Sequence, residues 1–132
     1  MCSSDLSDLS DAEIESRVTR VVKHAAIEID ATAEQQEKII ALVTATAKDL
    51  KPVHARMHAT GKEIHDLLLA TTVDRAALEK LRAARLADAE QVSRDVVKTV
   101  ADIADLLSPE QRKPLDERIQ QFRHMRRGWH RG

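Results

Sequence analysis

Three histidines in the segment KPVHARMHATGKEIHDLL have the residue type and the spacing for metal binding. His54, His58 and His65 lie at i, i+4 and i+11, so on a helix they fall within about 40° of one another. Two neutral imidazoles one turn apart can bind a transition metal. The same histidines lie about 100° from the apolar face of the segment, where helices ordinarily carry solvated polar residues. The spacing therefore permits either a metal pair or a solvated face, and no HExxH-type pattern accompanies it.

The sequence carries no recognisable catalytic or phosphate-binding pattern. Serine and threonine occur mostly at predicted helix starts, and no glycine-rich loop is present. Carboxylates alternate with lysine and arginine at helical spacing, as on a solvated helix surface. We therefore expect a protein that is not an enzyme and that needs no cofactor.

The distribution of charge limits the classes of partner. From Gln111 onward the chain is basic, which is typical either of a surface that attracts acidic partners or of a solvated helix end. The sequence has no aromatic stacking platform, zinc-finger spacing or helix-turn-helix pattern, so we expect no nucleic-acid partner. No stretch approaches the roughly 18 apolar residues of a membrane span, so we expect no membrane insertion.

The composition predicts an all-α protein with a thin aliphatic core. The chain has 132 residues, of which 33% are charged and only 2% are aromatic, with three glycines and three prolines. Such a composition favours long amphipathic helices with exposed charged faces. A core without large aromatic side chains buries little surface in a chain of this length, so dimerisation is physically expected.

Apolar residues at steps of three and four predict four helices. The first spans about residues 12–27 and the second about residues 33–70, with a bend near residues 48–52 because Pro52 has no backbone N–H to donate. The third begins after the N-cap residue Asp74. The apolar stripe of this third helix has no large apolar residue between Leu81 and Val92, which indicates either close helix approach through alanines or a partly open groove.

Two predicted helix starts share the same local sequence pattern. Thr32 precedes AEQ, so its hydroxyl can cap the second helix while Gln35 reaches back to the backbone N–H of the cap residue. Near the C-terminus, LSPEQ repeats the pattern with Ser108 and Gln111, and opens the last helix with proline at its first position. Each copy is therefore predicted to be a capping box.

Two such L-[ST]-x-x-Q boxes, separated by a long helical hairpin, resemble the Spy/CpxP family of periplasmic proteins, in which an LTxxQ motif is repeated. The second copy, from Leu107 to Gln111, matches the motif with Ser108 in place of threonine, whereas the first, ATAEQ, lacks the leading leucine. The resemblance covers about residues 14–125 and includes the proline-containing segment with the three histidines.

The resemblance implies a thin four-helix protein with a long bent helical hairpin that forms a cradle-like antiparallel homodimer. The implied function is that of an ATP-independent periplasmic chaperone, a holdase that binds unfolded or stressed envelope proteins. The alternative is a periplasmic metal-responsive sensor or regulator of an envelope-stress or metal-resistance system, which would use His54, His58 and His65.

A holdase needs shallow apolar patches bordered by mobile cations, and the second and third helices supply both. The residues that we expect to bind clients are Val53, Arg56, Met57, Lys62, Ile64, Leu68, Arg82 and Arg85. Buried core is the alternative role for the apolar members of this set. Methionine suits adaptable contacts, which favours Met57 as a client-binding residue.

The two ends of the chain are expected to lie outside the folded domain. The first six residues, MCSSDL, resemble a translated sequencing-library adapter, so we expect residues 1–11 to be artefactual or disordered and Cys2 to have no role. We expect the helical domain to span residues 12–126 and residues 127–132 to form a basic flexible tail. A periplasmic location would then require a signal peptide upstream of a truncated N-terminus.

Overall fold

The computed structural model describes residues 6–131, except for the side chains of residues 122 and 125–131. These residues form four α-helices and one short 3-10 helix, and the part of the chain described contains no strand. The elements are η1 (Leu6–Asp8), α1 (Asp11–Ile29), α2 (Ala33–Leu68), α3 (Arg75–Leu106) and α4 (Pro109–Arg131). The all-α prediction and the four helices are confirmed.

Local side-chain hydrogen bonds explain where the helices begin. Thr32 caps α2 and Ser108 caps α4, each with a glutamine three residues later that closes the capping box. The Asp74 carboxylate accepts a hydrogen bond from the Ala77 N–H at the start of α3. These three starts lie at the predicted residues because their signals span only three positions.

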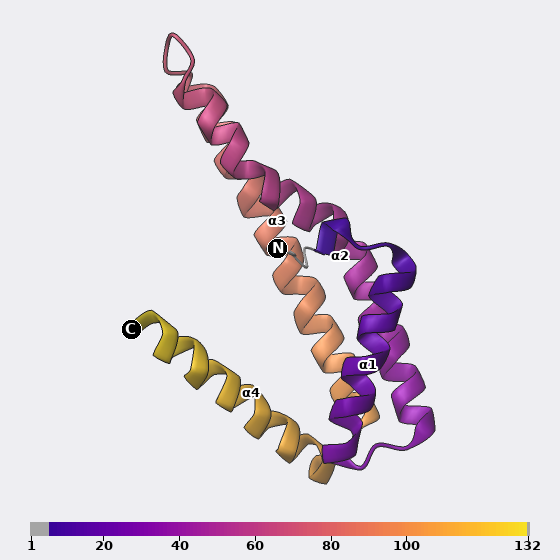
Figure 1. Cartoon of the computed structure of the whole chain (residues 1–132). Coiled ribbons are helices and arrows are strands. Elements are labelled where there is room, and N and C mark those ends of the chain that lie inside the picture. Colours follow the sequence, from indigo (N-terminus) through magenta and orange to yellow (C-terminus); the bar gives the residue numbers. More distant parts are fainter. Residues whose placement is uncertain (1–5, 132) are drawn as a thin grey trace.

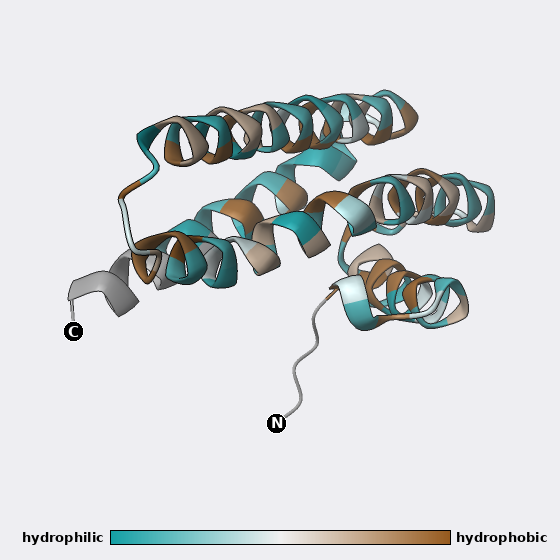
Figure 2. Ribbon diagram, turned by 90° about the horizontal axis from the view of Figure 1, so that it is seen from above, coloured by the Kyte–Doolittle hydropathy of each residue, from teal (hydrophilic) through white to brown (hydrophobic). Residues whose placement is uncertain are grey.

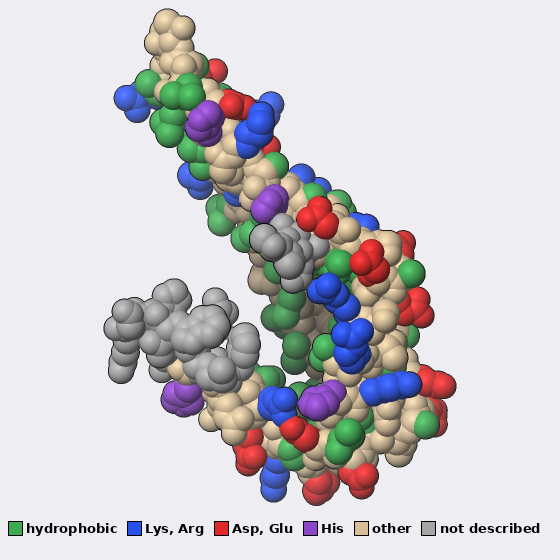
Figure 3. Space-filling view, viewed as in Figure 1, with side chains coloured by type: hydrophobic (Ala, Val, Ile, Leu, Met, Phe, Trp, Pro, Cys, Tyr) green, Lys and Arg blue, Asp and Glu red, His purple; other side chains and the backbone are tan. Residues whose placement is uncertain are grey.

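The α-helices form an open curved array instead of a bundle around one centre (Figure 1). Helices α2 and α3 make a long antiparallel hairpin, and α1 packs on the half of α2 nearer to its N-terminus. Helix α4 leaves the base of the hairpin and makes contact with α1. The space-filling view has the outline of an open hook, with hydrophobic side chains along part of its inner margin (Figure 3).

The core is thin. Among the described residues, the buried apolar side chains are Ile14, Ala26, Ile39, Val53 and Leu107. Residues of high and low hydropathy are interspersed along the helices (Figure 2). Many apolar side chains are exposed, among them those of Ile27, Leu68 and Val97. A chain with so little buried apolar surface has little hydrophobic stabilisation as a monomer.

The apolar stripe of α2 is covered only as far as α1 reaches. Ile39 and Val53 are buried, whereas Met57, Ile64 and Leu68 continue the same stripe and are exposed. Beyond Val53 the fold has only the two layers of the hairpin, so nothing in the described chain covers this side of α2. Figure 1 also shows α2 changing direction about midway, and Pro52 lies inside this helix as expected.

The structure adds local detail at both ends of the chain and within α3. Residues 6–11 include η1, which packs against α2, and Ser10, which caps α1 in a capping box with Glu13. The backbone of the predicted tail is helical through Arg131, while its side chains and residues 1–5, including Cys2, lie outside the described part. Between Leu81 and Val92 of α3, the alanines at 84, 87 and 89 are exposed and do not mediate close helix approach. The second alternative holds instead, because Leu81, Ala84 and Arg85 line a groove between α2 and α3. Asp88 in the same stretch is buried.

Candidate functional site

The two capping boxes meet in space and are joined through their glutamines. The Gln35 Nε2 donates to the Gln111 Oε1 at 3.0 Å, and the Gln111 Nε2 donates to the Gln35 Oε1 at 2.9 Å. The two residues are 76 positions apart in the sequence. The repeated motif therefore does more than begin two helices, because its two copies form one reciprocal amide pair.

Each amide in this pair is fully used. The Gln35 Oε1 also accepts from the Thr32 N–H, and the Gln111 Oε1 accepts from the Ser108 N–H, both at 2.9 Å. The remaining N–H groups donate to backbone carbonyls, from Gln35 to Leu106 at 2.8 Å and from Gln111 to Asp30 at 3.3 Å. The pair thus ties the α1–α2 turn, the end of α3 and the starts of α2 and α4 together.

The geometry explains why the last motif position is glutamine in both copies. A glutamate would accept the capping hydrogen bond equally well, but it has no N–H to donate to the partner motif or to a carbonyl. Two carboxylates facing each other would also repel. The leading residue of the second motif, Leu107, is 4% exposed and anchors the start of α4 in the core.

Helices α2 and α3 are joined farther along by a charged cluster. The Asp88 side chain is 8% exposed and accepts hydrogen bonds from Arg56 at 2.9 and 3.2 Å. The Arg85 Nη2 lies 3.2 Å from the other carboxylate oxygen of Asp88. Arg85 also donates to the Arg56 carbonyl at 2.5 Å. The hydrogen bond from Arg56 lowers the pKa of Asp88 against the opposing effect of burial.

The residues predicted to bind clients separate into core and surface. Val53 is 1% exposed, so its assignment to a client-binding surface is wrong: α1 and η1 pack on this half of α2. Met57, Ile64 and Leu68 are 47%, 39% and 66% exposed. These three share one face of α2, and we name them the α2 stripe.

The four predicted cations differ in how firmly they are held. Arg56 and Arg85 bind Asp88 in the cluster, which restricts them. Lys62 pairs with Asp66 at 3.3 Å, and Arg82 hydrogen-bonds Glu79 at 2.9 Å, both within one exposed helical turn. Such surface pairs contribute little stability, roughly 0.2–1 kcal/mol. Lys62 and Arg82 can therefore exchange their partners for others more readily than the two clustered arginines.

The histidine stripe does not form a three-ligand site in the described structure. His54 is half-buried, His58 and His65 are exposed, and the His65 Nδ1 lies 3.4 Å from an Asp66 oxygen. Within the described residues, no group of three or more His, Cys, Asp or Glu side chains is placed to hold a metal ion. All three histidines lie on α2 at the predicted spacing, but they are not gathered around one point.

Sequence reasoning missed exposed aliphatic residues on two other helices. On α1, Val21 and Ile27 are 66% and 79% exposed. On α3, the exposed members are Leu86, Val96, Val97 and Val100. Their apolar character and helical spacing resemble core positions, and only the arrangement of the helices shows that no described element covers them.

The fold and the glutamine pair define a class of all-α protein. It has a helical hairpin flanked by two helices, and hydrogen bonds between Gln35 and Gln111 join its two repeated helix starts. The family model described as LTXXQ motif family protein matches residues 12–119. The chain belongs to this family, which covers Spy/CpxP-like periplasmic proteins. Neither the curated proteins nor the solved structures searched gave a match. Over the described residues, no helix has the length and hydropathy of a membrane span.

Proposed function

We propose that the protein is an ATP-independent periplasmic chaperone, a holdase that binds unfolded or stressed envelope proteins. Membership of a family that covers Spy/CpxP-like proteins supports this class of function. The observation that carries the proposal is the α2 stripe, which continues the core face of α2 beyond the cover of α1 and stays exposed. Contiguous exposed apolar residues on a folded protein are typical of a protein-binding surface.

The chemistry of the surroundings suits weak and reversible binding. The α2 stripe contains a methionine, whose flexible side chain adapts to different apolar partners. Lys62 and Arg82 lie in exposed pairs and can attract clients that carry negative charge. We therefore expect binding to weaken as salt rises and clients to be released as they bury their own apolar residues. No catalytic role is proposed.

The central test is suppression of aggregation of a chemically denatured client without nucleotide. Met57→Asp and Ile64→Asp should lower suppression, because each places a carboxylate in the α2 stripe. Ala55→Asp is the matched control, since Ala55 is an exposed residue of the same helix outside this stripe. All variants should keep the parent's helicity. If the parent fails to suppress aggregation at several-fold molar excess, the chaperone proposal is wrong.

We also propose that the working form is the cradle-like antiparallel homodimer. The exposed aliphatic residues of α3, together with the thin core, support association with a second copy. Multi-angle light scattering should give twice the chain mass at micromolar concentration. A monomer of unchanged helicity would contradict the dimer, and a secretion signal in the complete gene would support the periplasmic location.

A further inference from the structure

Helix α3 has a second apolar face, on a side that does not pack against α2. Leu86, Val97 and Val100 on this side are 62%, 67% and 54% exposed. Together with the small exposed residues Ala89 and Ser93 they recur at steps of three and four. On a helix these five residues fall within about 80° of one another, so they form one continuous strip, which we name the outer face of α3.

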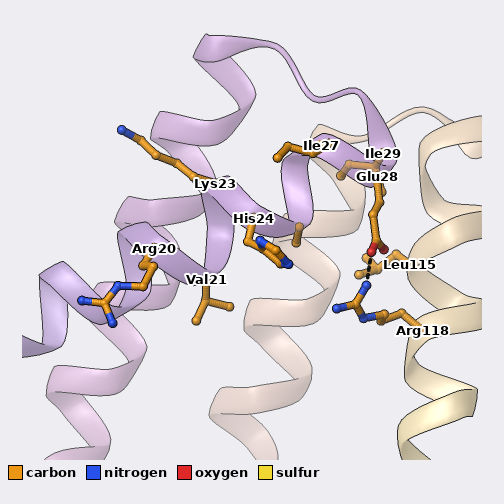
Figure 4. A pocket seen from close by; sticks show the side chains of 10 residues that line it. Arg20, Val21, Lys23, His24, Ile27, Glu28, Ile29, Leu115 and Arg118 are labelled. Carbon is orange, nitrogen blue, oxygen red and sulfur yellow. Dashed lines mark hydrogen bonds and ion pairs between the residues drawn. The ribbon is translucent and has the colours of Figure 1, made fainter.

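Within the described residues, no helix covers the outer face of α3. Helix α3 packs on α2 through a different side, which carries the hydrogen-bonded residues Asp88 and Thr99. These two residues lie more than about 100° around the helix from Ser93. Helix α4 packs on α1, where the Arg118 guanidinium pairs with the Glu28 carboxylate (Figure 4). The aliphatic side chains of the outer face are therefore free to meet a partner.

The outer face of α3 is symmetric about Ser93. Leu86 and Val100 lie seven residues before and after Ser93, and Ala89 and Val97 lie four residues before and after it. If two copies of α3 pack antiparallel with Ser93 at the centre, Leu86 of each copy meets Val100 of the other, and Ala89 meets Val97. A face that is complementary to itself in this way favours a second copy over an unrelated protein.

The polar groups near Ser93 suit the same arrangement. The Ser93 hydroxyl donates to the Glu90 carbonyl at 2.9 Å, so an interface at this position leaves the hydroxyl satisfied. Glu90 and Arg94 form an exposed ion pair at 2.6 Å on one flank of the outer face. In an antiparallel pair the same flanks of the two copies are adjacent, so Glu90 of each copy faces Arg94 of the other. Charge complementarity thus agrees with the apolar register.

We propose that the outer face of α3 is the interface of the homodimer, with the two-fold axis at Ser93. This assignment rests on the antiparallel dimer proposed above. It places the two α3 helices in contact and points the tips of the two hairpins in opposite directions. The small residues Ala89 and Ser93 let the two helices approach closely near the axis. Since the α2 stripe lies on another helix, the dimer contact and the client contact use different residues.

Disulfide cross-linking of the full chain tests the register. With the only native cysteine replaced (Cys2→Ser), Ser93→Cys should form a disulfide-linked dimer on mild oxidation, because Ser93 lies next to its equivalent in the second copy. Leu86→Cys and Val100→Cys should not cross-link singly, since equivalent residues then lie about 21 Å apart along the helices. A mixture of these two variants should cross-link. Gln91→Cys is the matched control and should stay monomeric on a non-reducing gel, because Gln91 is exposed on the opposite side of α3.

Charge substitutions test the strength of the interface. Val97→Asp should raise the dissociation constant of the dimer, measured by sedimentation, by roughly tenfold or more, because it places carboxylates in the apolar contact. Val73→Asp is the matched control, since Val73 is 65% exposed against 67% for Val97 but lies in the turn between α2 and α3. Glu90→Arg and Arg94→Glu should each weaken the homodimer, and a mixture of the two variants should associate as a heterodimer. Circular dichroism should show parent-like helicity for all of them.

The remaining outcomes separate this interface from the proposals on which it rests. A parent dimer in which Ser93→Cys does not cross-link and Val97→Asp keeps the parent's dissociation constant would overturn the interface alone. A monomeric parent would overturn both the dimer and the interface. If Val97→Asp leaves the dimer intact but lowers suppression of aggregation, the outer face of α3 binds clients and the interface is overturned. If the predicted cross-links form in a parent that does not suppress aggregation, the chaperone proposal fails and the interface stands.

Discussion

Replacement of Gln111 by alanine tests the idea that the two motif copies stabilise the fold through each other. The substitution removes four side-chain hydrogen bonds: one within the capping box, two with Gln35 and one with the Asp30 carbonyl. A net hydrogen bond contributes roughly 0.5–1.5 kcal/mol, and the half-exposed site lets water replace part of the loss. We therefore expect Gln111→Ala to lower the free energy of unfolding by about 2–3 kcal/mol.

A capping box without a cross-motif pair provides the control. Glu13 closes the box at the start of α1 with Ser10. Glu13→Ala should cost about 1 kcal/mol, because only the local hydrogen bond of its carboxylate is lost. Ser108→Ala should likewise cost about 1 kcal/mol through loss of the N-cap. Gln111→Glu keeps the capping acceptor but loses both donated bonds, so it should fall between Glu13→Ala and Gln111→Ala.

Urea denaturation followed by circular dichroism measures these differences, and a double-mutant cycle isolates the pair. The double variant Gln35→Ala/Gln111→Ala should be less destabilised than the sum of the single variants, with a coupling of about 1 kcal/mol. Additive effects, with coupling near zero, would refute the reciprocal pair. A large loss of client binding by Gln111→Ala at unchanged stability would instead mean that the motif is itself a binding site.

Three further predictions concern the core, the charged cluster and the histidines. Val53→Ala should cost about 2 kcal/mol in urea denaturation, whereas Met57→Ala should cost under about 1 kcal/mol because Met57 is exposed. The pKa of Asp88 is lowered in the folded state, so its carboxylate stabilises the fold above the unfolded pKa, and this stabilisation is lost as the pH falls through the folded pKa. Asp88→Asn should therefore lower the free energy of unfolding at pH 7 by about 2 kcal/mol. The difference in stability between this variant and the parent should shrink in acid. Calorimetry with zinc, copper and nickel should find no tight stoichiometric binding, and tight binding abolished by His58→Ala would favour the sensor alternative over the chaperone.

The sequence by itself determined the helices and their starts. Thr32 with Gln35, Ser108 with Gln111 and the N-cap Asp74 act over three residues, so their geometry follows from backbone structure that is nearly the same in every helix. The apolar spacing and the scarcity of aromatic residues likewise predicted the fold class and the thin core. The contact of η1 with α2 was not predicted, because it joins segments that are distant in the sequence, and the capping box of Ser10 with Glu13 was not considered.

Only the tertiary structure decided which of these features meet. The contact of Gln35 with Gln111 joins residues on different helices, and no local pattern specifies the path of the chain between them. In the same way, one apolar stripe of α2 holds buried Val53 and exposed Met57, because the reach of α1 and not the helical period sets the boundary. Local hydrogen bonding and periodicity identify a helix and its apolar face, but the packing of the other helices determines which part of that face remains open to a partner.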